Sequence, residues 1–169
     1  MLICDDDELE LGALKRTAAD AGFEIVDTAR HAIELLQLVQ VHQPEAAIVR
    51  NEINGVSGLE VTEDLSRLEP PVEVILVTTD VSLEPLGLAA GAFAVVLRRD
   101  TEMLETALGA LGERLAGGER RKGTDRRAGM DRRQLQDWAQ VYSERRAGED
   151  RRKELRRDAD RNPQPPDAG

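Results

Sequence analysis

Residues 2–7 carry the sequence Leu-Ile-Cys-Asp-Asp-Asp, in which three apolar residues run directly into three aspartates. Four more short apolar runs follow, at residues 24–26, 46–49, 74–77 and 93–97. Segments of helical length separate them, at residues 9–21, 31–41, 58–68, 83–90 and 101–115. Short, continuous apolar runs are typical of strands buried on both faces of a sheet. The pattern therefore predicts five strand–helix units in residues 1–117.

Strands joined by single crossover helices run parallel to one another. Right-handed crossovers then place helices on both faces of the sheet. The predicted fold class is α/β, with a doubly wound parallel sheet. In such a sheet, ligands bind beyond the carboxyl ends of the strands. The residues at those ends are the candidates for a functional site: Asp5, Asp6, Asp7, Arg50, Thr78 and Arg98.

The charge divides the chain into two parts. Residues 1–117 contain 22 acidic and 8 basic residues, a net charge of −14, whereas residues 118–169 contain 11 acidic and 15 basic residues, a net charge of +4. We therefore expect a folded domain at 1–117 and a polar, Arg-rich tail at 118–169 that is partly helical or disordered. The chain has no long uncharged apolar run and no secretory leader pattern. These absences predict a cytoplasmic protein without a membrane span.

The tail contains a repeat. Glu-Arg-Arg-Lys-Gly-Thr-Asp-Arg-Arg occupies residues 119–127, and Glu-Arg-Arg-Ala-Gly-Glu-Asp-Arg-Arg occupies residues 144–152. The arginines expected to contact an anion or a partner are Arg120, Arg121, Arg126, Arg127, Arg145, Arg146, Arg151 and Arg152. Nucleic-acid phosphate, lipid headgroups, an acidic protein and the chain's own acidic domain are the candidate partners. Nucleic acid is the least expected, because the charge of −14 on residues 1–117 opposes approach to a polyanion.

The three adjacent aspartates imply a positive group among them, because neighbouring carboxylates raise one another's pKa. One candidate is a divalent ion such as Mg²⁺, which prefers oxygen ligands. The other candidates are the basic side chains at the strand ends. A metal site of several cysteines or histidines is not expected, because the chain has one cysteine, Cys4, and two distant histidines, His31 and His42.

Four motifs resemble the receiver domain of bacterial two-component response regulators. They are residues 2–7, the Gly-Val-Ser-Gly-Leu-Glu stretch at 55–60, Val77-Thr78, and Gly91-Ala92 followed by Arg98. The resemblance covers about residues 1–117. It implies a flavodoxin-like (βα)5 sandwich with strand order 2-1-3-4-5. It also implies a phosphorylation switch built from an acidic pair that holds Mg²⁺, a phosphoacceptor aspartate ending the third strand, a Thr or Ser, and a Lys. Asp5, Asp6 and Thr78 match those residue types.

The other positions depart from the family pattern. With residues 58–60 as the anchor, the acceptor aspartate falls on Arg50 and the lysine on Arg98. Val95 stands where receivers often carry an aromatic residue in the fifth strand. A guanidinium cannot accept a phosphoryl group, and Glu52 is offset by two residues. The resemblance is therefore to a degenerate receiver that lacks the phosphoacceptor aspartate.

Our hypothesis is that Arg50 pairs with Asp5 or Asp6 and replaces a metal as counter-ion. We then expect no cofactor; if Mg²⁺ does bind, Asp5 and Asp6 are its ligands. The alternatives are that Arg50 extends into solvent above hydrated acids, or that residues 5–7 form a working metal site.

The favoured function is a phosphorylation-independent interaction module for a signalling protein, with a homodimer as a further option. Its partner surface is expected to include residues 83–88 and 104–111. The alternatives are a phosphorelay regulator with an atypical acceptor and an anion-binding adaptor that acts through its Arg repeats. We do not expect an enzyme, because the strand ends offer no nucleophile beside a base and no phosphate-binding glycine loop.

Overall fold

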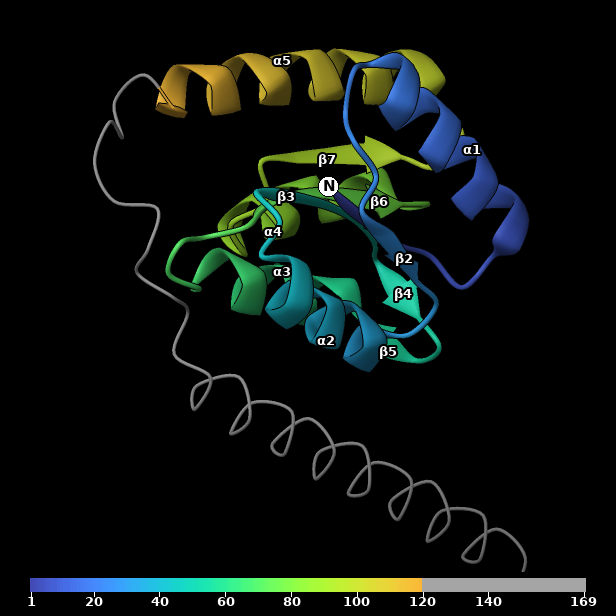
Figure 1. The fold of residues 1–169 in the computed structure, drawn as a ribbon. Helices are drawn as coiled ribbons and strands as arrows, with labels where there is room; N and C mark the ends of the chain where they lie inside the picture. The colour runs from blue at the N-terminus through green and yellow to red at the C-terminus, as the bar shows by residue number, and fades with distance from the viewer. Residues whose placement is uncertain (120–169) are drawn as a thin grey trace, which may run out of the picture. The chain divides into compact units, whose positions relative to one another are not determined.

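The computed structural model describes residues 1–119, which are drawn in colour in Figure 1. The predictions made for the tail, including its eight paired arginines and its partly helical or disordered character, lie outside the described residues. No helix within residues 1–119 has the length and apolar character needed to cross a membrane.

A five-stranded parallel sheet forms the centre of the fold. Its strands are β1 (Leu2–Cys4), β2 (Asp27–Ala29), β3 (Ala46–Arg50), β6 (Glu73–Thr78) and β7 (Ala94–Leu97). They lie in the order β2-β1-β3-β6-β7, and every neighbouring pair is parallel. When these five strands are counted along the chain, the order is 2-1-3-4-5. The predicted doubly wound, flavodoxin-like sheet is confirmed.

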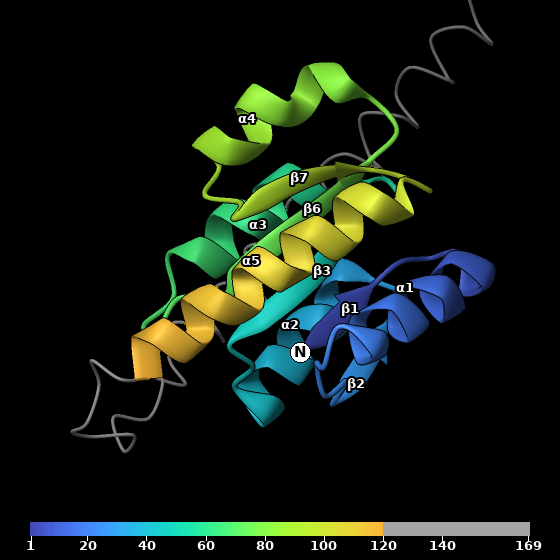
Figure 2. The same ribbon diagram turned by 90° about the horizontal axis from the view of Figure 1, so that it is seen from above.

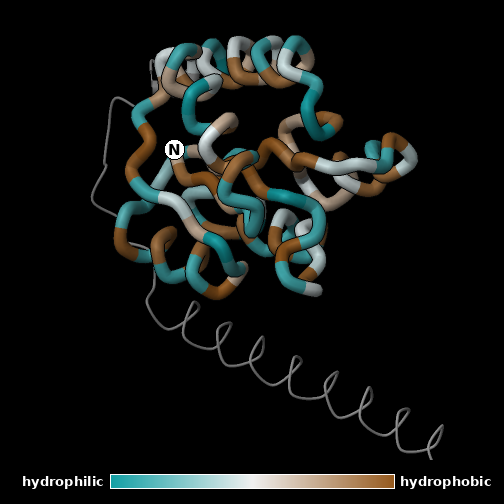
Figure 3. Tube along the Cα trace, turned by 90° about the vertical axis from the view of Figure 1, so that its right-hand side faces the viewer, coloured by the Kyte–Doolittle hydropathy of each residue, from teal (hydrophilic) through white to brown (hydrophobic). Residues whose placement is uncertain are grey.

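Helices cover both faces of this sheet (Figures 1 and 2). Helices α1 (Glu8–Asp20) and α5 (Thr101–Glu119) lie on one face. The other face carries α2 (Ala32–His42), α3 (Gly58–Ser66) and the short α4 (Glu84–Ala89), which follows the 3₁₀ turn η1 (Val81–Leu83). Brown, hydrophobic segments mark the strands in the centre of Figure 3, as expected for strands buried on both sides.

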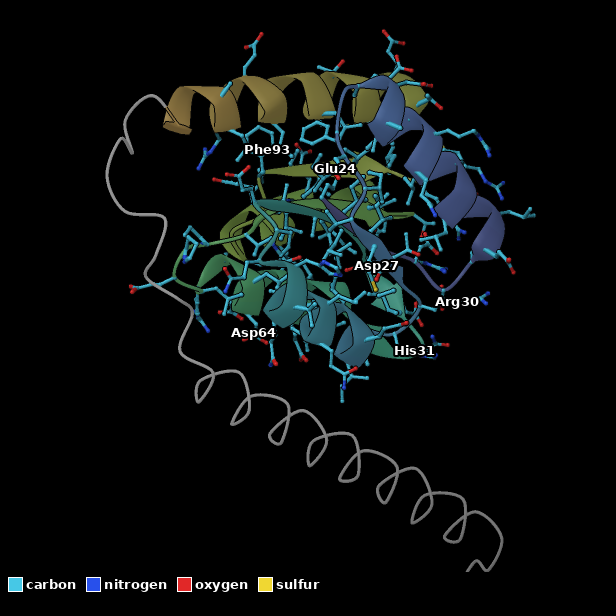
Figure 4. The ribbon with its side chains drawn as sticks, in the orientation of Figure 1. Glu24, Asp27, Arg30, His31, Asp64 and Phe93 are labelled. Carbon is cyan, nitrogen blue, oxygen red and sulfur yellow. The ribbon has the colours of Figure 1, made fainter. Side chains whose placement is uncertain are left out.

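The larger core cluster lies between the sheet and the helices α1 and α5. Ile3, Ile48 and Ile75 project from three adjacent strands toward this side, and Leu14 and Leu108 meet them from the helices. Phe93 packs against the same cluster, as Figure 4 shows beneath α5, and the guanidinium of Arg114 lies 5.5 Å from the centre of its ring. Burial of this aliphatic surface is the main stabilising contribution, at about 25 cal/mol per Å² of apolar area.

The inward position of the α5 leucines corrects one expectation. Residues 104–111 were expected to form part of a partner surface, yet Leu104, Leu108 and Leu111 lie in the core. An amphipathic helix on a sheet turns its leucines inward, so any surface on α5 is made by its other residues. On the α4 side, Leu86 and Leu88 are 56% and 49% exposed.

The second strand also differs from prediction. The apolar run 24–26 leads into the sheet, and the strand itself is Asp27–Ala29. The Val26 amide donates to the Met1 carbonyl at 3.0 Å, just before the regular pairing of β2 with β1 begins. In β2, Asp27 is exposed and Thr28 is half-buried, so these residues need not be apolar. The other strands are buried, and their apolar runs therefore identify them as strands in the sequence.

A small hairpin follows β3 and was not predicted. Strands β4 (Glu52–Ile53) and β5 (Val56–Ser57) pair antiparallel. Asn54 and Gly55 connect them with φ values of 52° and 80°, and an Asn-Gly pair favours this left-handed turn.

Candidate functional site

The predicted site residues meet at the carboxyl edge of the sheet, as adjacent parallel strands require. β1 leads into Asp5–Asp7, β3 ends at Arg50, β6 ends at Thr78, and Arg98 follows β7. The charged residues among them form two groups of ion pairs. Arg50 contacts Asp5 and Asp6, whereas Arg98 contacts Asp7.

Arg50 lies over the first two aspartates. Its Nη1 atom is 3.3 Å from Asp5 Oδ1 and also donates a short hydrogen bond to Asp6 Oδ1. The other Asp6 oxygen accepts the backbone N–H of Asn54 at 3.2 Å, which ties the hairpin to the same loop. The side chains of Arg50 and Asp6 are each 24% exposed, and that of Asp5 is 1% exposed. Water therefore has little access to the Arg50–Asp5 pair.

Asp5 is the most deeply buried acid of the cluster. Its Oδ1 atom accepts the Asp7 backbone N–H at 2.9 Å in addition to Arg50, while its buried Oδ2 has no hydrogen-bond partner within the described residues. Burial raises the pKa of Asp5, and the Asp7 N–H and the charges of Arg50 and Arg98 oppose this rise only in part. The ionised form of Asp5 therefore depends on its positive neighbours.

The second group joins α1 to the turn after β7. Arg98 Nη2 lies 2.8 Å from Asp7 Oδ2, and its Nε atom lies 3.7 Å from Glu10 Oε1. Arg99, with φ of 69°, brings its Nε to within 3.0 Å of the same Glu10 oxygen. Sequence reasoning missed Glu10. The sequence could have indicated Glu10 by its position three residues after Asp7. At that spacing, both carboxylates lie at the first turn of α1.

Asp7 has two roles in this arrangement. It caps α1 by accepting the backbone N–H groups of Leu9 at 3.0 Å and Glu10 at 3.4 Å. Desolvation raises the pKa of Asp7, but those N–H groups and Arg98 together outweigh it and hold the pKa below its ordinary value. The Asp7 carboxylate is therefore ionised at neutral pH and remains paired.

Thr78 is buried and bonded within its own turn. Its Oγ1 atom accepts the Asp80 backbone N–H at 3.1 Å, a local turn bond typical of Thr after a strand. Its backbone carbonyl accepts the Arg98 N–H at 2.7 Å. Thr78 thus fixes the β6 turn beside the arginines.

The loop after Arg50 is closed by a tight backbone contact. The Gly58 N–H donates to the Asn51 carbonyl at 2.5 Å. A Cβ at Gly58 would lie 2.2 Å from the Arg50 carbonyl oxygen, so no other residue fits here. Glu52, the offset carboxylate, is exposed in β4 opposite Ser57. The hairpin also reaches the β2–α2 loop, where Asn54 Nδ2 donates to the Arg30 carbonyl at 2.9 Å and lies 3.0 Å from His31 Nδ1 (Arg30 and His31 are labelled in Figure 4).

A divalent cation does not fit this cluster as it is arranged. Mg²⁺ would need carboxylate oxygens of Asp5 and Asp6, and Arg50 already contacts Oδ1 of each. Within residues 1–119, no three His, Cys, Asp or Glu side chains are grouped as metal ligands. A cation at this position would also face the charge of the Arg50 guanidinium.

Comparison with known proteins agrees with the fold. The family model described as "Response regulator receiver domain" matches residues 1–108, so the chain belongs to the response regulator receiver domain family. The transcriptional regulatory protein HptR of Staphylococcus aureus is 28% identical over 114 residues, which are 66% of this chain and 45% of HptR. The chain thus aligns with slightly less than half the length of that relative.

Solved receiver structures are similar as well. A CheY-like receiver domain from Methanospirillum hungatei is 26% identical with a TM-score of 0.59, and the match covers 71% of this chain and 95% of that one. The receiver domain of a Luxo repressor protein from Vibrio parahaemolyticus has a TM-score of 0.65 at 18% identity, covering 73% of this chain and 96% of that one. The latter similarity concerns the fold alone.

Proposed function

We propose that this protein is a phosphorylation-independent receiver that acts as a protein–protein interaction module in cytoplasmic bacterial signalling. The observation that carries the proposal is the position of Arg50. It ends β3, where the family resemblance places the phosphoacceptor aspartate, and its guanidinium lies on Asp5 and Asp6.

The chemistry of Arg50 supports the loss of phosphorylation. Forming an acyl phosphate requires a carboxylate oxygen that attacks phosphorus, and a guanidinium has no such oxygen. Glu52, the nearest alternative on this loop, is exposed in the β4–β5 hairpin. Moving its carboxylate to the Arg50 position would break the β4–β5 pairing.

The electrostatics support the loss of the metal. Arg50 is charged at every physiological pH and supplies the positive charge that the buried Asp5 carboxylate needs. For Mg²⁺ to bind, the guanidinium would have to leave both aspartates. We therefore include in the proposal that the protein requires no cofactor and catalyses no reaction.

Without a phosphorylation trigger, the function of the domain is recognition of a signalling partner by a fixed surface. The two ion-pair groups support this role, because they join the loop after β1 to the hairpin after β3 and to the turn after β7. The exposed residues Leu86 and Leu88 on α4 are available to such a partner.

The decisive experiment is a titration of Mg²⁺ with and without beryllofluoride, a mimic of the phosphoryl group, followed by amide NMR. We expect no response around Asp5, Thr78 and Arg98 in the native protein. Arg50→Asp, which supplies an acceptor carboxylate, is expected to respond. Arg50→Gln is the matched control that removes the charge without adding an acceptor. A beryllofluoride response in the native protein would refute the proposal.

A further inference from the structure

The strand β2 has a free edge. Within residues 1–119, β2 pairs with β1 alone. The Ala29 carbonyl accepts the Asp5 backbone N–H at 3.2 Å and therefore faces β1. Because successive residues of a strand direct their N–H and C=O groups to opposite sides, Thr28 directs its own groups toward the free edge. Unpaired backbone groups at an edge are a template for pairing with another strand.

Asp27 occupies the outward N–H of this strand. Its Oδ1 atom accepts the Thr28 backbone N–H at 2.8 Å, and its Oδ2 atom lies 3.6 Å from Nε2 of His42, in the last turn of α2. Asp27 is labelled beside β2 in Figure 4. Both oxygens of the carboxylate thus contact groups of their own domain. While the first contact is formed, the N–H that a neighbouring strand would use is not available.

A second copy of this chain fits the free edge. Thr28 is the middle residue of β2, so a two-fold axis through it would place Asp27 opposite Ala29 of the second copy and keep the two carboxylates apart. Helix α2, which packs against β2, carries one acidic residue, Glu34, whereas α1 and α5 carry three and four. In a domain with a charge of −14, the α2 side therefore repels a second copy less than the α1–α5 side does.

We propose that the Asp27 carboxylate masks the free edge of β2 against antiparallel pairing with a second copy of this chain. The contact is autoinhibitory, because pairing requires Asp27 to release the Thr28 N–H. The two Thr28 residues would then exchange two hydrogen bonds, each N–H donating to the carbonyl of the other. A charged side chain at an edge strand is a common means of preventing such pairing.

The test compares the self-association of full-length variants by analytical ultracentrifugation over a series of concentrations. Asp27→Ala removes the mask. We expect it to associate about 30-fold more tightly than the native protein, which is the effect of two added hydrogen bonds of ordinary net strength. Asp27→Asn is the matched control, because its amide oxygen can still accept the Thr28 N–H without the charge, and it should associate as the native protein does. Equal tightening in both variants would overturn the proposal, since repulsion between carboxylates would then keep the copies apart.

A further variant tests the location. Proline has no N–H, and at an outward position it removes no hydrogen bond to β1. Asp27→Ala/Thr28→Pro should therefore associate no more tightly than the native protein, with amide NMR reporting that the fold is kept. In Asp27→Ala, hydrogen exchange of the Thr28 amide should slow as the protein concentration rises. Exchange independent of concentration, no tightening in Asp27→Ala, or tightening kept in the folded double variant would each overturn the proposal.

Discussion

Replacing Arg50 with glutamine removes the positive charge from the most buried ion pair of the site. An exposed ion pair contributes about 0–1 kcal/mol, and breaking a fully buried one costs about 3–5 kcal/mol. Here Asp5 is 1% exposed, whereas Asp6 and Arg50 are each 24% exposed. The Arg50 contacts therefore lie between these limits, and we expect a loss of about 2 kcal/mol in the free energy of unfolding at pH 7.

The loss should depend on pH in a defined direction. Burial raises the pKa of Asp5 in the folded protein above its value in the unfolded chain. A carboxyl with a raised folded pKa destabilises the fold when it is ionised, and that destabilisation is relieved as pH falls through the folded pKa. Without Arg50 the pKa of Asp5 rises further, so the difference between variant and native protein should shrink between neutral pH and the ordinary aspartate pKa of about 3.9.

Urea unfolding at several pH values measures both effects. Arg67→Gln is the matched control, because Arg67 caps the carboxyl end of α3 and forms an exposed pair with Glu63 of that helix. This variant should lose no more than about 0.5 kcal/mol in the free energy of unfolding. Asp5→Asn in the Arg50→Gln background should recover part of the stability. A pH-independent loss no larger than that of Arg67→Gln would refute the reasoning, since Arg50 would then act as a solvated side chain.

Three further outcomes are expected. Gly58→Ala should lower the free energy of unfolding by about 1–3 kcal/mol in urea titration, because the alanine Cβ would lie 2.2 Å from the Arg50 carbonyl oxygen. An unchanged free energy of unfolding would contradict the close backbone contact at Gly58. Asp7→Asn should make the decline of stability below pH 4 shallower. Because the pKa of Asp7 is lower in the folded protein than in the unfolded chain, where it is about 3.9, ionised Asp7 stabilises the fold above that pH, and this contribution is lost as the pH falls through the folded pKa. An unchanged decline of stability at acid pH would contradict this role. Glu10→Gln should shift the amide signals of Arg98 and Arg99 by NMR while leaving those of Arg50 in place, and a shift confined to α1 would argue against the contact across the edge of the sheet.

The sequence by itself was sufficient for the architecture. Strands β1, β3, β6 and β7 are buried on both faces, so their apolar runs were recognisable without a structure. Single helices between strands imposed a parallel sheet, which brought Asp5, Arg50, Thr78 and Arg98 to one edge. β2 was displaced from its predicted position because Asp27 is exposed and Thr28 is half-buried, so that hydrogen bonds to β1 hold this strand. Such bonds are formed by the backbone and leave no apolar pattern.

Only the tertiary structure decided which charges pair. The sequence allowed Arg50 to pair with Asp5 or Asp6 or to extend into solvent, and the fold brings it to both aspartates. Glu10 and Arg99 entered the site without a motif, because their contact joins residues 89 positions apart. The outward face of α5 likewise became visible once the leucines were placed in the core. The spacing of apolar residues is a local property that can be identified in the sequence. Ion pairing and burial depend on distances in space, which are set only when the chain folds.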